Sequence, residues 1–211
     1  MKKYLAVLAA LAVATPLAAQ TSFGVRGGMT LSTLAASEED EEIEVSYLAG
    51  FHLGVTASLW SGGPGLLVYA AYAQRGTALT ADIPVGLDSG EGFDASVDLA
   101  YVDVSAFGRI PIGTGPYLLV GPTLGLRVAC STTVSAESVN VTGDCGDIED
   151  NPYKPLEFGV SGGAGVSFDV GGRDVVVEAL YGFSILSIVD VGDDTVRNRG
   201  FTFQAGVDFG R

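Results

Sequence analysis

His52 is the single histidine of this 211-residue chain and the side chain best suited to acid–base chemistry. A histidine can act as the general base for a serine when a carboxylate orients its ring. Ser58 and Asp103 are the candidate partners, but no motif in their spacing selects either of them. The competing interpretation is a structural histidine enclosed by side chains such as Arg26, Asp103 or Tyr101. We favour it and predict no enzymatic activity, with an enzyme or lipid-handling protein that uses His52 as the alternative.

Two cysteines, Cys130 and Cys145, lie in one irregular stretch of the sequence. A zinc site would need further cysteines or histidines close by, and the stretch has none. In an exported chain, a pair of cysteines this close favours a disulfide. We therefore predict a Cys130–Cys145 disulfide and no bound metal or cofactor.

Three runs of the chain are strongly acidic, namely Glu38–Glu44, Asp144–Asp150 and Asp190–Asp194. Carboxylates are the ligands that Ca²⁺ prefers, but the middle run does not have the spaced ligands of an EF-hand loop. The residues concerned are Asp144, Asp147, Glu149 and Asp150. We interpret the three runs as solvated acidic loops that repel themselves.

The N-terminus resembles an export signal. Lys2 and Lys3 precede an apolar run over Leu5–Ala14, and small residues follow up to a cleavage site near Thr21. We predict a signal peptide over residues 1–20 and one mature domain over residues 21–211. Loss of the two lysines changes the formal net charge from −14 to −16. Such an acidic chain is a poor partner for nucleic acid.

Eight segments of the mature chain are long enough to cross a bilayer as tilted strands, for which about 9–11 residues are needed. In the last of them, apolar residues alternate with small or polar ones from Phe201 to Phe209, which places the two kinds on opposite faces. The eight segments are Ser22–Thr33, Tyr47–Trp60, Gly65–Thr77, Ser96–Ile110, Pro116–Ala129, Leu156–Val170, Val175–Leu186 and Asn198–Phe209.

The connections between these segments alternate in length. Residues 34–46, 78–95, 130–155 and 187–197 form long connections, whereas residues 61–64, 111–115 and 171–174 form short turns rich in Gly and Pro. Short turns at one end and long loops at the other are typical of outer-membrane β-barrels. Aromatic residues also mark two predicted girdles: Phe23, Trp60 and Phe209 at the turn end, Tyr47 and Phe201 at the loop end.

Charged residues with inward parity predict a paired network inside the barrel. Because eight strands enclose only enough space for side chains, we predict that these charges form a plug and do not line a pore. Arg127 and Glu157 have similar heights on adjacent segments, so we expect them to form a direct or near-direct ion pair. The predicted network comprises Arg26, Arg75, Asp103, Arg109, Arg127, Glu157, Asp169, Glu178 and Asp208.

Several segments resemble the PorT-like outer-membrane β-barrel proteins. The resemblance rests on residues 23–34, Ala73-Gln74-Arg75-Gly76, residues 117–125 and residues 162–166. It covers nearly all of the mature chain and implies an eight-stranded barrel of the OmpA or OmpX kind. The residues that carry it build strands and imply no catalytic activity.

The predicted fold is therefore all-β, an eight-stranded antiparallel up-and-down transmembrane β-barrel in the outer membrane. We expect a monomer with both termini in the periplasm and its acidic loops outside the cell. The expected role is structural or interactive: membrane integrity, adhesion or assistance to secretion. The expected partners are the lipid bilayer and a protein that binds the acidic loops.

Overall fold

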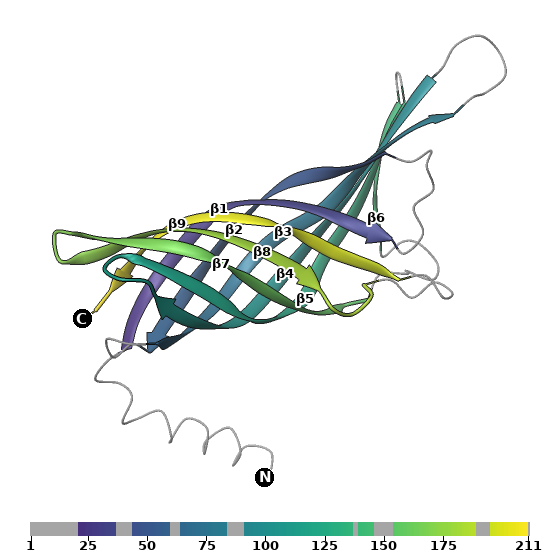
Figure 1. Cartoon of the computed structure of the whole chain (residues 1–211). Coiled ribbons are helices and arrows are strands. Elements are labelled where there is room, and N and C mark those ends of the chain that lie inside the picture. The colour runs from purple at the N-terminus through teal and green to yellow at the C-terminus, as the bar shows by residue number, and fades with distance from the viewer. Residues whose placement is uncertain are drawn as a thin grey trace, which may run out of the picture.

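Eight strands of the chain form a closed antiparallel barrel, and a ninth lies outside it (Figure 1). The computed structural model describes residues 21–36, 44–59, 64–83, 91–136, 139–145, 154–188 and 195–210. The strands are β1 (Thr21–Ala36), β2 (Glu44–Leu59), β3 (Gly65–Ile83), β4 (Glu91–Pro111), β5 (Pro116–Ala136), β6 (Val139–Asp144), β7 (Leu156–Val170), β8 (Arg173–Ser184) and β9 (Val196–Phe209).

Neighbouring strands of the barrel pair in chain order, as an up-and-down topology requires. The one exception is β6, which pairs with the outer part of β5 and leaves β7 to pair with the rest of that strand. The first and last strands, β1 and β9, pair from Phe23 with Phe209 to Ala36 with Val196 and close the cylinder. The predicted fold class is confirmed, with β6 as an addition.

The two ends of the barrel differ, and we call them the turn end and the loop end. The turn end carries the β4–β5 and β7–β8 hairpins and the C-terminal end of β9 (Figure 1). Gly171 and Gly172 form the two-residue β7–β8 turn with φ of 63° and 79°, a conformation that other residues adopt only with strain. The loop end is the opposite end, where Ala36 pairs with Val196 and Ile83 pairs with Glu91.

Side chains alternate between the two faces of the wall as the sequence predicted. On β5, Leu118, Val120 and Leu124 are exposed on the outside, whereas Tyr117 and Leu119 are buried inside. The girdle residues Phe23, Tyr47, Phe201 and Phe209 are all exposed on the outer face. An outer surface this apolar is unfavourable in water and suited to lipid.

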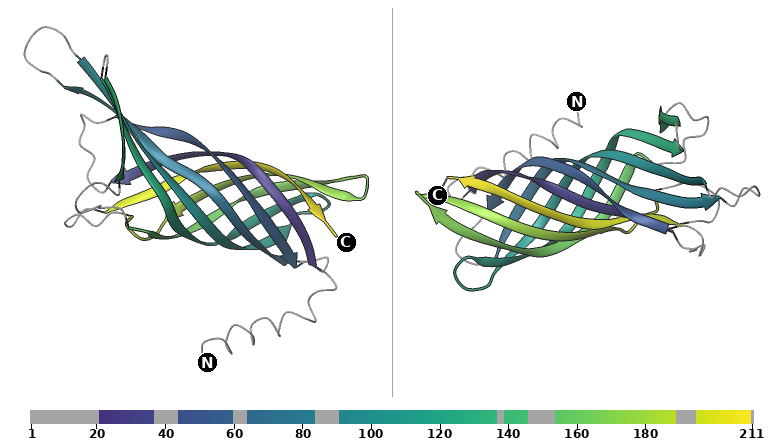
Figure 2. Two further views of the ribbon diagram at one scale, coloured as in Figure 1. Left: turned by 180° about the vertical axis from the view of Figure 1, so that it is seen from behind. Right: turned by 90° about the horizontal axis from the view of Figure 1, so that it is seen from above.

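Three strands continue well past the barrel at the loop end. We predicted loops over residues 78–95 and 130–155, and this prediction is wrong for residues 78–83, 91–95, 130–136 and 139–144. Instead β3, β4 and β5 project outward as a twisted sheet, to which β6 adds an edge strand (Figures 1 and 2). We call this part the outer sheet: residues 76–83, 91–99, 130–136 and 139–144.

Two β-bulges mark the height at which the outer sheet leaves the barrel. On β2, four residues between Tyr47 and His52 face three residues of β3. On β5, Val128 is the extra residue opposite the Ala100–Tyr101 step of β4. Because a bulge bends its strand and increases the local twist, both bulges fit the change of direction there.

The bulge on β2 leaves backbone groups of β3 for other partners. Ser32 of β1 lies across β2 from Gly76 and satisfies both backbone groups of that residue. Its hydroxyl donates to the Gly76 carbonyl at 3.2 Å and accepts from the Gly76 N–H at 2.8 Å. Thr30 donates in the same way to the Gln74 carbonyl at 2.5 Å. The inner face of β1 thereby fastens β3 at the bulge.

Some predictions fall outside the described residues. These are the signal peptide, Trp60, the turn at residues 61–63 and the acidic residues at positions 38–43, 147–150 and 190–194. No helix within the described ranges is long and apolar enough to cross a membrane.

Candidate functional site

The inside of the barrel holds two ionic clusters, one above the other. The lower cluster, nearer the turn end, is built on Arg26 of β1. Its guanidinium makes two bonds to Asp208 of β9, Nη1 to Oδ1 at 2.8 Å and Nη2 to Oδ2 at 3.1 Å. Its Nε lies 3.4 Å from Glu178 of β8. Only 1% of the Arg26 surface is exposed, so this charge depends on these carboxylates.

Two uncharged donors complete the lower cluster. Tyr117 donates its hydroxyl hydrogen to Glu178 at 2.5 Å, and the Gln204 amide donates to the other oxygen of the same carboxylate. The Gln204 carbonyl oxygen in turn lies 2.7 Å from Nε2 of His52. The network therefore runs from Asp208 to His52 across four strands.

His52 sits in this network without the partners that catalysis needs. Its ring is buried and meets Tyr69 edge-on at 6.3 Å between centroids. Among the described residues, the only side chain hydrogen-bonded to it is Gln204. Ser58, a candidate nucleophile, is six residues further along β2, roughly 20 Å away at strand spacing. We expected lumenal side chains such as Arg26, Asp103 or Tyr101 around His52. The contacts shown are with Gln204 and Tyr69, and Asp103 lines the same cavity as His52.

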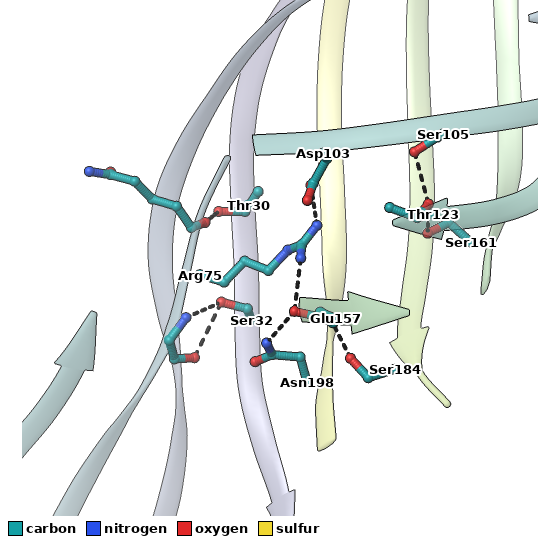
Figure 3. Close-up of polar contacts among 12 residues, drawn as sticks. Thr30, Ser32, Arg75, Asp103, Ser105, Thr123, Glu157, Ser161, Ser184 and Asn198 are labelled. Carbon is teal, nitrogen blue, oxygen red and sulfur yellow. Dashed lines mark hydrogen bonds and ion pairs between the residues drawn. The ribbon is translucent and has the colours of Figure 1, made fainter. Parts of the chain in front are cut away.

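The upper cluster, which Figure 3 shows, is built on Arg75. Arg75 of β3 pairs with Asp103 of β4 and, at 3.2 Å, with Glu157 of β7. Asn198 donates its amide hydrogen to Glu157 at 2.9 Å, and Ser184 donates its hydroxyl hydrogen to the other oxygen. Each cluster thus has one arginine, two carboxylates, one hydroxyl and one amide.

Glu157 has an ion-pair partner that the sequence did not predict, because Arg75 reaches it from across the lumen. The direct or near-direct pair expected between Glu157 and Arg127, which lies on the adjacent strand β5, stays a prediction. Because the strands of a barrel are staggered, the position of a residue along its own strand does not show which side chain it meets across the lumen. Arg127 is half-buried with the inward parity predicted for it.

Two further members of the predicted network lie outside the two clusters. Arg109 places its guanidinium 3.8 Å from the centre of the Tyr117 ring, a cation–π contact beside the lower cluster. Asp169 is exposed at the turn end, where its carboxylate accepts the Gly172 N–H at 3.3 Å. The prediction of Asp169 in the lumen is therefore wrong. The Asp169 side chain has the inward parity, but at the end of a hairpin the inner face of the strand is open to solvent.

The sequence analysis missed four uncharged members of the clusters. They share the inward parity of their strands, so the same alternation could have identified them: Tyr117, Ser184, Asn198 and Gln204.

Part of the lumen is apolar, although we predicted a polar interior. Leu67, Phe107, Leu119 and Leu180 pack together with Tyr69 at the height of the lower cluster. Above this group, a cavity of about 90 Å³ lies between the two clusters. Residues from both levels line it, among them Thr30, His52, Tyr69, Asp103 and Ser161.

A second buried apolar group lies at the loop end. Cys130 and Cys145 form the predicted disulfide, with their Cα atoms 5.4 Å apart. They pack with Leu99 and Ile188, and Ile188 is held by backbone bonds to Lys154 and Val196 at 2.7 and 2.8 Å. Tyr101 of the same group lies beside Arg75, with the guanidinium carbon 5.0 Å from the ring centre, so the group adjoins the upper cluster.

The described residues offer no metal centre: no group of three histidine, cysteine or acidic side chains is placed to hold an ion. The ions of the two clusters pair with one another and bond to neutral donors. Chemically, the interior can stabilise the wall of the barrel and obstruct passage through it.

A closed antiparallel barrel with an apolar outer band and a paired polar interior defines the class of outer-membrane β-barrel proteins. Residues 18–190 match the family model described as outer membrane protein beta-barrel domain. The chain belongs to this family, and it is a protein of the outer membrane, embedded in the lipid bilayer.

Solved structures of other barrels are similar to this chain at low identity. The attachment invasion locus protein Ail of Yersinia pestis, in complex with the heparin analogue sucrose octasulfate, is 18% identical, with 90% of this chain and 99% of Ail covered and a TM-score of 0.44. Neisserial surface protein A is 16% identical, with coverages of 89% and 97% and a TM-score of 0.41. OprG of Pseudomonas aeruginosa is 12% identical, with coverages of 90% and 96% and a TM-score of 0.40. No curated protein sequence matches the chain.

Proposed function

We propose that the protein is a non-enzymatic surface protein whose barrel is a closed anchor and whose outer sheet binds a partner outside the cell. The observation that carries the proposal is the contrast between the two parts. The lumen holds two ionic clusters and two apolar groups, whereas β3, β4 and β5 extend past the barrel as a sheet. The part of the protein that can bind a partner outside the cell is therefore the outer sheet.

The disulfide supports this division. Cys130 lies at the base of the outer sheet on β5, and Cys145 follows β6 directly. The crosslink fixes the edge strand to the barrel mouth, so the sheet keeps one orientation. A rigid surface loses little conformational entropy when it binds a partner.

The charge of the outer sheet indicates the kind of partner. Asp94, Asp98 and Asp144 are exposed on it, and hydroxyl side chains from Ser131 to Ser135 lie beside them. The acidic loops predicted at the same end add to this charge. We propose a protein partner with a basic surface, whose association should weaken as salt increases.

The test separates adhesion from membrane integrity in one experiment. Cells lacking the protein are complemented with the wild-type chain or with a variant in which residues 81–93 are replaced by Asn-Gly, a two-residue hairpin turn, and the exposed acids Asp94, Asp98 and Asp144 are replaced by Asn. Thr80 and Asp94 are paired in the structure, so the shortened β3–β4 hairpin can close. Adhesion and detergent resistance are then measured.

We expect the shortened variant to restore detergent resistance but not adhesion. A heat-modifiable band of equal intensity on gels controls for folding. If the shortened variant restores adhesion to the wild-type level, the sheet is not the binding surface.

The resemblance to the PorT-like proteins in the narrower sense stays a prediction from the sequence.

A further inference from the structure

Two arginines face outward at the loop end of β9, next to each other on one side of the strand. Arg197 and Arg199 are both exposed, and among the described residues neither has an ion-pair partner. Four other arginines of this acidic chain, Arg26, Arg75, Arg109 and Arg127, face the lumen. A pair of outward cations at this height therefore stands out in a protein of net charge −14.

An aromatic group continues from the arginines down the same face of β9. Residues at every second position of a strand share one side, so Phe201 and Phe203 follow Arg199 on the lipid-facing surface. The rings of Phe201 and Phe203 stack with their centroids 6.2 Å apart, and Tyr181 of β8 lies 5.0 Å from Phe201. All three rings are exposed on the barrel wall.

A shallow apolar groove crosses the wall below the rings. Its lining includes small residues that pair across neighbouring strands, Gly27 with Ala205 and Ala164 with Ala179, together with Val166 and Val177. Met29 and Phe203 rise at its upper edge. Short side chains at these positions leave the wall hollow where the rest of the band carries Leu, Val and Phe.

The spacing of these features matches one leaflet of a membrane. Ala205 is six residues from Arg199, roughly 20 Å along the strand, which a tilt near 40° reduces to about 15 Å of depth. The apolar band of such a barrel is about 25 Å high, so the groove lies near its middle. The arginines then lie at the level of the outer headgroups, since the loop end of outer-membrane barrels faces outside.

We propose that this face of β9 binds one phosphorylated glycolipid of the outer leaflet, of the lipid A type. Its phosphate would lie between Arg197 and Arg199, because guanidinium groups bond phosphate oxygens in pairs. One acyl chain would pack on Phe201 and Phe203 and end in the groove. The site lies on the barrel wall, apart from the outer sheet, and goes beyond the proposed binding function.

The experiment measures lipid binding to the mature protein by native mass spectrometry from detergent micelles, with lipid A as the probe. We expect one tightly bound lipid A in the wild type. The double variant R197S/R199S should bind at least tenfold more weakly. Arg173→Ser is the matched control, because Arg173 is an exposed arginine at the turn end, over the ring of Phe209. It should bind as the wild type does.

Two further measurements distinguish the contribution of the headgroup from that of the acyl chain, and the binding of lipid A from that of other lipids. Ala205→Phe fills the groove without touching the arginines and should also weaken binding. Lipid A from which the phosphates have been removed, and phosphatidylglycerol, should both bind more weakly than lipid A. Equal binding of lipid A by the wild type and R197S/R199S overturns the proposal. Equal binding of phosphatidylglycerol and lipid A overturns the assignment to a glycolipid.

Discussion

Arg26 and Asp208 join the first strand of the barrel to the last. The two parallel bonds between them, at 2.8 and 3.1 Å, lie inside the seam at which β1 and β9 close the cylinder. The pair is almost completely buried, so each charge relies on the other and on Glu178.

Removal of one member of this pair should therefore be costly. We expect Arg26→Met to lower the free energy of unfolding by about 3–5 kcal/mol, because it leaves two buried carboxylates without their cation. Urea titration of the protein in lipid vesicles measures this. The double variant R26M/D208L should lose less than the sum of the two single variants. Strict additivity would show that the two residues do not interact.

Ser32 should matter more than an ordinary strand serine. Ser32→Ala leaves the N–H and the carbonyl of Gly76 without their hydroxyl partner at the β2 bulge, and we expect a loss of about 1–3 kcal/mol. Ser135→Ala is the control, since its hydroxyl bonds Asn140 at an exposed position of the outer sheet. The same urea titration applies. Equal losses in the two variants would argue against a role of Ser32 at the bulge.

The disulfide should stabilise the outer sheet and not the barrel itself. For a loop of this length, the loss of the crosslink in C130A/C145A costs about 3 kcal/mol by the loop-entropy model. We expect faster proteolysis in residues 130–145 with an unchanged heat-modifiable band. Loss of that band would mean that the barrel itself requires the disulfide.

His52 should be replaceable. His52→Gln keeps a hydrogen-bonding group toward Gln204, so we expect a stability change under about 1 kcal/mol. Gln204→Leu should cost more, because it removes a donor to Glu178 as well as the partner of His52. Esterase or lipase activity that disappears in His52→Ala would contradict the structural role and support the enzymatic alternative.

The sequence predicted the wall of the barrel well, because alternation places each residue inside or outside with no knowledge of its neighbours. Glu157 and Arg26 were assigned to the lumen in this way, and β7 has the predicted bounds, Leu156–Val170. Asp169 shows the limit of the argument. Parity fixes the direction of a side chain, but burial also requires other strands around it.

Two features were not accessible to this reasoning. The pairing of Arg75 with Glu157 depends on the stagger of strands that are far apart in sequence. The outer sheet was taken for loops because its segments are polar, such as Ser131-Thr132-Thr133 on β5. A strand outside the bilayer needs backbone partners but no apolar face, so hydrophobic alternation cannot reveal it.

Surface labelling of intact cells tests the central claim most directly, that the barrel spans the outer membrane with its loop end outside. An epitope is inserted at Glu41, between β1 and β2, or at Gly172, in the β7–β8 turn, and an antibody is added before or after permeabilisation. We predict labelling of the Glu41 insertion on intact cells, and of the Gly172 insertion only after permeabilisation. Labelling of the Gly172 insertion alone on intact cells would contradict the account, because the outer sheet would then lie in the periplasm.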